Sequence, residues 1–389
     1  MSDDGSPHHP VLATVSDPEE DFPFVPGNTA ELLVNGVRFF PAMLDAMRAA
    51  TRSITLETFI WKPGRISNEF IEVMCERARA GVKVHVLVDG FGSGEFAEDD
   101  RARFESAGVE YSKYHRRHWW HLKPNINHRT HRKILVVDGR VGFTGGMCID
   151  DRWLGDAESP EVWRETQVRL TGPIVAHLQA AFAVNWKKTT EVWLDDEKYF
   201  PQLEVTGPVV GQGSISGPGE GPHRTESAYL EAIESAQHSI DLANAYFIPD
   251  DCLRDALIAA STRGVRVRII APAINDAPFG RVAARSRFGR LLAAGVELYL
   301  YHAAMYHAKT MGVDDHRVII GSANCDHRSF RLNDEVLACL DDTNLAAGHR
   351  QMFEHDLRGA HRLTREEFAQ RKWHIKVGDH FAGLFRWFL

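Results

Sequence analysis

The sequence predicts an α/β protein of two similar lobes, each a mixed, mostly parallel β-sheet flanked by helices, with the functional site between the lobes. Helix-like windows alternate with short runs of β-branched residues, which is the pattern of βαβ units. The order of these segments in residues 30–205 repeats in residues 223–389. A length of 389 residues also fits two or three domains of about 150 residues each.

Two segments have compositions that differ from the lobes. Residues 1–29 contain several prolines and acidic residues but no Lys or Arg, so we expect a poorly ordered acidic tail. Glycine and proline crowd together again in residues 206–222, which include the run GPVVGQGSISGPGEGP. We expect a linker between the two lobes there.

The two lobes are predicted to contain the same elements in the same order. In the first lobe a helix over residues 42–53 precedes the strand-like runs ITLETFIW, GVKVHVLVDG, AGVEYSKYH and HRKILVVDGRVGFTGG. In the second lobe the helical run TESAYLEAIESAQ precedes IDLANAYFIP, GVRVRIIAP, AGVELYLYH and HAKTMGVDDHRVIIGS. A repeat of this length indicates two duplicated domains, because solenoid repeats are much shorter.

Composition excludes several classes of protein. With 44% hydrophobic and 25% charged residues, the chain is expected to be soluble and globular rather than disordered, collagen-like or coiled-coil. No apolar run reaches the ~18 residues that a transmembrane helix needs, and the N-terminus lacks the basic start of a secretory signal. The net charge of −8 argues against nucleic-acid binding through global positive charge. The 5 cysteines are scattered without CxxC spacing, which favours free thiols in a reducing compartment.

Each lobe ends in the same constellation of chemically active residues. The two copies are His131-x-Lys133-(four residues)-Asp138 and His307-x-Lys309-(four residues)-Asp314. On a strand, residues i and i+2 point to the same face, so each motif presents an imidazole beside an ammonium group. A single match of this kind arises by chance in roughly a few per cent of chains this size, but two matches at equivalent places of a duplication do not.

These groups suit a phosphate. A neutral histidine can attack phosphorus or exchange a proton near neutral pH, and a lysine neutralises the phosphoryl oxygens. Two copies that meet place one histidine as nucleophile and the other as leaving-group acid, so a displacement proceeds in two steps through a phosphohistidine. No HExxH or similar ligand set is present. We therefore expect neither a metal nor another cofactor.

On these residues the chain resembles the phospholipase D superfamily, and within it the bacterial cardiolipin synthases. The resemblance extends from about Ala30 to the C-terminus and includes WRETQVRLTGP and GSANCDHRSFRLNDE. It implies two α/β lobes sharing one metal-free site, and transfer of a phosphatidyl group from one phosphatidylglycerol to another to give cardiolipin and glycerol. A hydrolase that uses water as acceptor stays open, and a nuclease is disfavoured by the charge.

The resemblance also implies supporting residues. By motif match, Glu335 orients His307 and Glu165 orients His131. The family's commoner assignment makes His131 the nucleophile, although the two halves are near-equivalent in sequence. Asparagine usually follows the first Gly-Gly, and here that position is Cys148. The residues expected to bind the substrate phosphate are Gly145, Gly146, Ser322 and Asn324.

Two segments are expected to contact a membrane. A basic stretch with paired tryptophans suits anionic lipid headgroups, although single-stranded nucleic acid or an ordinary solvated loop would also fit. The C-terminus has an apolar stripe at helical spacing, which could be an in-plane anchor or could dock on the core. The predicted contact residues are Arg116, Arg117, Trp119, Trp120, Phe381, Phe385 and Phe388. We thus expect a peripheral protein on the cytoplasmic side of the cell membrane, with anionic phospholipid as its partner and without nucleic acid.

Overall fold

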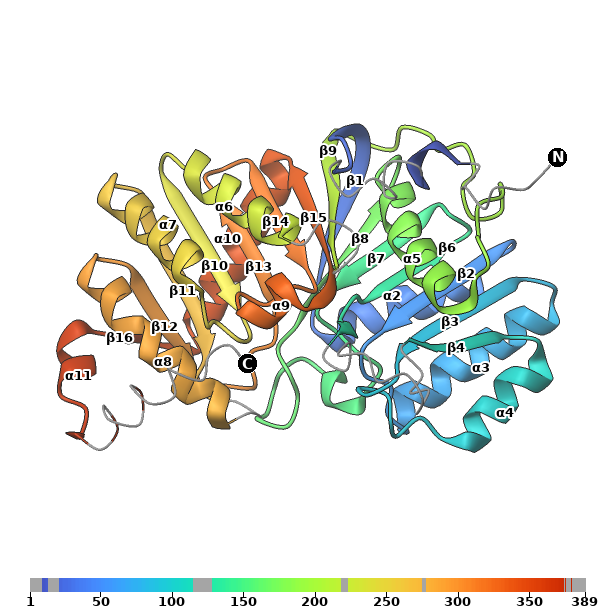
Figure 1. Ribbon diagram of the computed structural model, residues 1–389, viewed down its shortest axis with the longest axis horizontal. Coiled ribbons are helices and arrows are strands. Elements are labelled where there is room, and N and C mark those ends of the chain that lie inside the picture. Colours follow the sequence, from blue (N-terminus) through green and yellow to red (C-terminus); the bar gives the residue numbers. More distant parts are fainter. Residues whose placement is uncertain are drawn as a thin grey trace.

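A computed structural model describes residues 9–12, 21–114, 128–217, 223–274, 278–373, 375 and 379. Its strands form one sheet of 16 strands that runs through both lobes, which lie side by side (Figure 1). The first lobe contains β1 (Val25–Val34), α2 (Gly36–Arg48), β2 (Ser53–Thr58), α3 (Arg65–Arg79), β3 (Lys83–Asp89), α4 (Glu98–Ala107), β4 (Glu110–Tyr114), β5 (Arg129–Thr130), β6 (Ile134–Val137), β7 (Val141–Gly145), β8 (Thr166–Thr171) and α5 (Val175–Thr190).

The second lobe repeats this order. It contains β9 (Val209–Ser216), α6 (Arg224–Ser235), β10 (Ser239–Asn244), α7 (Asp251–Thr262), β11 (Arg266–Pro272), α8 (Pro278–Ala293), β12 (Glu297–Tyr301), β13 (Lys309–Val313), β14 (Arg317–Gly321), α9 (His327–Arg331), β15 (Asn333–Asp341), α10 (Thr343–Leu357), β16 (Ala360–Leu363) and α11 (Arg365–Ala369).

The sheet order makes the duplication visible. It runs β16-β12-β11-β10-β13-β14-β15-β9-β1-β8-β7-β6-β2-β3-β4, so each half reads outward from the centre in the same sequence of equivalent strands. The halves join where β1 and β9 pair antiparallel, with Val25 opposite Gly211 and Asn28 opposite Val209. The predicted α/β class with two similar lobes is confirmed.

The pairing is less parallel than the sequence predicts. Parallel pairs connect β2, β3 and β4 in one lobe and β10, β11 and β12 in the other, where helices provide the crossovers. The strands nearer the centre of the sheet pair antiparallel. The reason is the turn after each motif: Asp138 and Asp314 both have positive φ and open tight hairpins, β6–β7 and β13–β14, that leave no room for a crossover helix.

The structure corrects the predicted tail and linker. Phe22 is buried and stacks on His177 with ring centroids 4.3 Å apart, and β1 already begins at Val25, so residues 21–29 belong to the fold. Strand β9 lies within the predicted linker and pairs with both β15 and β1. Its glycines mark close packing rather than a turn, because a Cβ on Gly213 would come within 2.8 Å of the His177 side chain.

Helix α5 and its counterpart α10 connect the lobes. The buried residues of α5 share one hydrophobic cluster with residues of β9, β14 and β15, which are strands of the second lobe. A second cluster lies between α2, α3 and the sheet of the first lobe, and a third lies between α6, α7, α8 and the sheet of the second. Among the described residues, no helix is long and apolar enough to cross a membrane.

Candidate active site

The two motif histidines lie at the junction of the lobes, and each is bound by a carboxylate of the other lobe. His131 Nδ1 lies 2.9 and 3.0 Å from the two carboxylate oxygens of Glu335. His307 Nδ1 lies 2.6 Å from Oε2 of Glu165. The motif match pairs each acid with the histidine of its own lobe, and that prediction is wrong.

Backbone pairing across the junction causes the crossed arrangement. Strand β5 pairs in parallel with β15, and the His131 amide donates to the carbonyl of Asp334 at 2.9 Å. In the other half, Arg164 forms a bridge with Tyr306, and the His307 amide donates to the Arg164 carbonyl at 2.8 Å. Each histidine is thus held beside the residue that precedes the opposite lobe's glutamate.

The motif lysines are buried beside the histidines. Lys133 Nζ donates to the His131 carbonyl at 2.6 Å, and Lys309 Nζ donates to the His307 carbonyl at 2.6 Å. Lys309 Nζ also lies 3.2 and 3.3 Å from the two ring nitrogens of His307. Burial, together with the charge of Lys133, lowers the pKa of Lys309 to about 8, while Glu165 opposes the shift. Both lysines therefore belong to one positively charged centre that spans the junction.

The two carboxylates differ in their electrostatic state. Burial would raise the pKa of Glu335, but His131, Lys133 and the Ser322 hydroxyl outweigh it and lower the value to about 2. Burial raises the pKa of Glu165 to about 7, against the effect of Lys309. Glu335 is consequently a fixed anion, whereas Glu165 can exchange a proton near neutral pH.

Both histidines are neutral when the site is empty. Burial lowers the pKa of His131 to about 4 although Glu335 opposes it, and burial and Lys309 lower the pKa of His307. A carboxylate that accepts a hydrogen bond from Nδ1–H keeps the proton on Nδ1. The lone pair on Nε2 is then available to attack phosphorus or to bind a proton. The arrangement can therefore supply a nitrogen nucleophile and a second ring that exchanges a proton.

The residues expected to bind phosphate pack mainly against the two carboxylates. Ser322 Oγ donates to Oε2 of Glu335 at 2.5 Å. A Cβ on Gly146, the equivalent position, would lie 2.4 Å from Oε2 of Glu165, so only glycine fits. Gly145 has a φ of 154°, and a Cβ there would meet Gln167. Asn324 is buried with Oδ1 unpaired among the described residues.

Cys148 takes the place of an asparagine in the first half. Its side chain is buried and lies close enough to Lys133 and Lys309 to influence the pKa of both. A thiol is a weak hydrogen-bond donor, so this half offers less to a phosphate than the half that carries Asn324.

Asp138 and Asp314 do not join the histidines, contrary to the sequence analysis. Each stands at the far end of a motif strand, and four strand residues at about 3.3 Å each separate it from the lysine. Asp138 accepts hydrogen bonds from the amides of Arg52 and Ser53 at 2.7 and 2.9 Å. Asp314 does the same for residues 237–239. These aspartates fix the hairpin turn to the neighbouring strand.

Aromatic side chains that were not among the predicted site residues surround the two histidines. Trp153 and Trp163 lie with ring centroids 5.3 and 5.0 Å from that of His307. Phe59 lies 5.1 Å from the His131 ring and under the Lys133 ammonium. The runs ITLETFIW and WRET contain two of these residues, Phe59 and Trp163, and an aromatic residue near the end of a predicted strand was the available signal.

Glu57 was also missed, although it binds strand β5, which ends directly before His131. It is fully buried, and its Oε1 accepts hydrogen bonds from the Thr130 hydroxyl and, at 2.8 Å, from Asn185. Burial raises the pKa of Glu57 to about 7, and Arg132 opposes the shift. A glutamate as the one charged residue of a predicted strand was the signal for it.

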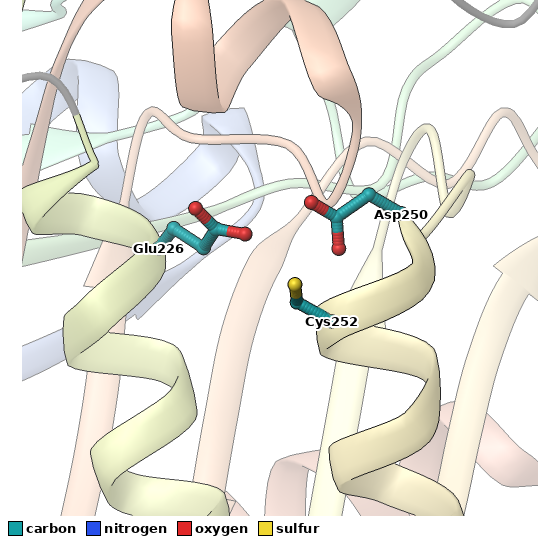
Figure 2. A group of neighbouring side chains, drawn as sticks. All are labelled: Glu226, Asp250 and Cys252. Carbon is teal, nitrogen blue, oxygen red and sulfur yellow. The ribbon is translucent and has the colours of Figure 1, made fainter.

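One group of possible metal ligands occurs among the described residues, and it lies apart from the histidines. Glu226, Asp250 and Cys252, at the N-terminal ends of α6 and α7, have ligand atoms within 4.8 Å of one another (Figure 2). Arg331 forms an ion pair with Glu226 and lies 3.7 Å from Asp250. This arginine pairs with both carboxylates, so the group is an ion-pair cluster that connects α6, α7 and α9.

An apolar cavity of about 220 Å³ lies in the second lobe, lined by residues of α8 and of the ends of β11 and β12. Its lining includes Tyr246, whose ring centroid is 6.2 Å from that of His307, together with Phe247, Phe288 and Leu300.

The predicted membrane contacts at residues 116–120 and 381–388 lie outside the described residues.

Comparison with known proteins gives a consistent result. The family described as cardiolipin synthase, PLD-like domain, matches residues 43–186 and 229–357. A probable cardiolipin synthase of Bacillus subtilis is 35% identical, covering 91% of this chain and 71% of its own length. A cardiolipin synthase of Staphylococcus aureus is 32% identical, covering 92% and 73%. The crystal structure of a phosphatidylserine synthase from Haemophilus influenzae has the same fold, with a TM-score of 0.71 at 15% identity over 97% of this chain and 99% of that one.

We predict that Asp138→Ala destabilises the protein without removing a catalytic group. Losing the acceptor for several backbone amides, and placing alanine at a φ of 54°, should lower the free energy of unfolding by about 2–3 kcal/mol. Urea denaturation measures this, and Asp138→Asn, which keeps one acceptor oxygen, should lose about half as much. If Asp138→Ala lost turnover but kept the stability of the unchanged protein, Asp138 would have a catalytic role.

We also predict that Glu57→Gln removes a pH dependence of stability. The pKa of Glu57 is about 7 in the folded protein against 4.5 ordinarily, so the unfolded chain releases this proton first and stability falls as pH rises from about 4.5 to 7. Glutamine cannot ionise, so the variant should lose less stability between pH 5 and pH 8, by roughly 3 kcal/mol at most. Urea denaturation at both pH values tests this. The same change in the free energy of unfolding from pH 5 to pH 8 in both proteins would contradict it.

Proposed function

This chain belongs to the cardiolipin synthase family of phospholipase D-like proteins, and from that premise we propose that it condenses two phosphatidylglycerol molecules into cardiolipin and glycerol. The observation that carries the proposal is the pair of His–Lys motifs at the lobe junction, each histidine bound by the opposite lobe's glutamate. Such a site can hold one phosphodiester between two imidazoles and neutralise it with two ammonium groups.

The reaction proceeds in two balanced steps. Nε2 of one histidine forms a bond to phosphorus, the bond from phosphorus to the glycerol headgroup breaks, and the other histidine gives its proton to the departing oxygen. The second histidine then takes a proton from the hydroxyl of an incoming phosphatidylglycerol, whose oxygen displaces the first histidine. The bound phosphodiester anion raises the pKa of the acidic histidine, so that ring can carry the proton that it lacks in the empty site.

We assign His131 as the nucleophile and His307 as the acid and base. The Lys309 ammonium lies 3.3 Å from Nε2 of His307, within reach to deliver a proton there. Glu165, bound to the same ring, has a pKa near 7 and can accept the proton on the other side. Glu335 is a fixed anion, which suits a histidine that becomes cationic when it bonds to phosphorus.

The enzyme would work at a membrane surface as a peripheral protein on the cytoplasmic side, with anionic phospholipid as its partner. Its substrates carry two acyl chains each and do not leave the bilayer freely. Phe91 is 72% exposed and Trp373 is 76% exposed, and large exposed side chains of this kind insert readily among lipid headgroups.

Incubation with vesicles that contain phosphatidylglycerol tests the function directly. We expect cardiolipin and glycerol in equal amounts by mass spectrometry, without a phosphatidyl donor of another headgroup, and we expect the enzyme to sediment with the vesicles. Phosphatidic acid as the main product would mean a hydrolase with water as acceptor. Cleavage of single-stranded DNA with no lipid product would mean a nuclease, and either result would refute the proposal.

An activated substrate separates the roles of the two histidines. A p-nitrophenyl phosphodiester needs no proton on its leaving group, so His307→Ala should release about one equivalent of p-nitrophenol and retain a phosphoryl adduct. His131→Ala should release none, and both variants should lose steady-state turnover. Intact-protein mass spectrometry identifies the adduct. An adduct on His307 in the His131→Ala protein would reverse the assignment.

A further inference from the structure

Cardiolipin contains two phosphates, and the site between the histidines accounts for only one of them. If the proposed function holds, the acceptor lipid brings a second phosphodiester to a place one glycerol away from the reacting phosphorus. That place must stabilise a negative charge and lie open to lipid. Two arginines at the junction of the lobes meet these requirements.

Arg129, in strand β5, comes two residues before His131 and four before Lys133. Along this segment the intervening side chains point the other way, because Thr130 bonds to Glu57 and Arg132 donates to the carbonyl of Ala181. The Arg129 guanidinium lies over the ring of Phe91 as the Lys133 ammonium lies over the ring of Phe59. Among the described residues, no carboxylate forms an ion pair with Arg129 at the distance of a salt bridge.

Arg328, on α9 of the second lobe, extends the same positive region. Asn333, two residues after α9, lies opposite Arg129 where β15 pairs with β5, so Arg328 and Arg129 lie on neighbouring segments. Burial lowers the pKa of the Arg328 guanidinium, and the charge of Arg129 lowers it further. Asp89 and Asp326 are near, but Asp89 accepts from the backbone amides of residues 91, 92 and 130. Asp326 accepts a hydrogen bond from the backbone amide of Ser329, and burial raises the pKa of Asp326.

The duplication breaks at this position. Residue 305 precedes His307 as residue 129 precedes His131, and there the second lobe has Met305, which is buried in the core of the first lobe. Both histidines, both lysines and both glutamates are kept in the two halves, but the arginine is present in one half only. A group needed once, rather than twice, fits the one acceptor of the reaction.

An exposed aromatic residue completes the arrangement. The Arg129 guanidinium stacks on the ring of Phe91 at 4.5 Å from the centroid, and Phe91 is 72% exposed. The loop is fixed to the site, because a Cβ on the next residue, Gly92, would come within 2.9 Å of the Phe59 ring that contacts His131. A cation held against an exposed aromatic ring matches the headgroup level of a bilayer.

We propose that Arg129 and Arg328 bind the phosphate of the acceptor phosphatidylglycerol and place its terminal hydroxyl at the phosphohistidine. Binding the acceptor in this way gives its hydroxyl a high effective concentration over water. Arg129 and Arg328 are therefore specificity-determining residues, which decide between transfer to a lipid and hydrolysis.

The test is the ratio of cardiolipin to phosphatidic acid that each protein makes from phosphatidylglycerol vesicles. In Arg129→Gln this ratio should fall at least about tenfold, the effect of losing one charge-assisted hydrogen bond, while the sum of the two products changes much less. Arg328→Gln should act in the same direction, and Arg129→Lys should recover part of the ratio. Each ratio is internal to one preparation, so a partly unfolded sample does not alter it.

Two controls make the result specific. Arg140→Gln removes an exposed arginine from the turn at the opposite end of β6 and should leave the ratio as in the unchanged protein. Ethanol, an acceptor without a phosphate, should give phosphatidylethanol equally well in Arg129→Gln and the unchanged protein. Inorganic phosphate competes for the two arginines, so raising its concentration should lower the ratio of cardiolipin to phosphatidic acid in the unchanged protein.

Three outcomes would overturn the inference. The ratio could stay unchanged in Arg129→Gln, the yield of phosphatidylethanol could fall in parallel with cardiolipin, or Arg140→Gln could act equally. A parallel fall would mean that Arg129 serves the donor lipid. If the unchanged protein makes no cardiolipin at all, the proposed function fails instead, so the two failures are distinguishable.

Discussion

The hydrogen bond between each motif histidine and the glutamate of the opposite lobe is the constraint on which the rest of the structure depends. Glu335 reaches His131 and Glu165 reaches His307 only because the central strands bring the lobes into one sheet. The pairing of β1 with β9 closes that sheet, and α5 covers the junction with apolar side chains. Neither lobe alone contains a histidine with its orienting acid.

Burying this many ionisable groups is costly, and the site balances them in opposite pairs. Two lysines stand against two glutamates, and the imidazoles stay neutral until substrate arrives. The balance is uneven, since the pKa of Glu335 is about 2 and keeps it charged, while the pKa of Glu165 is about 7. A duplicated scaffold thus gives two chemically unlike histidines, as a reaction with separate nucleophile and acid requires.

The fold and the central residues were largely predictable from sequence, because a duplicated motif leaves a signal in both halves. The strands around Val84 and Val267 appear as β-branched runs, and the structure brings His131 and His307 to one junction with their lysines. The partnership of the glutamates was not predictable, since sequence neighbourhood favours the acid of the same lobe and only the β5–β15 pairing reverses it. Asp138 was wrongly predicted to be catalytic because it belongs to the same sequence motif as His131 and Lys133. In the structure, strand β6 separates Asp138 from both residues. Gly213 likewise suggested a linker, although its lack of a side chain serves helix packing.

The crossed carboxylates also bear on how such a chain could arise. A single lobe, before any duplication, would have carried a histidine and a glutamate that could not reach each other. It would have become competent only when two copies associated about a two-fold axis, each completing the other. Fusion of the copies into one polypeptide then freed the halves to diverge, so that the equivalent positions now hold a core residue, Met305, and a half-buried one, Arg129. The asymmetry of the present molecule is therefore a property that a symmetric ancestral dimer could not have had.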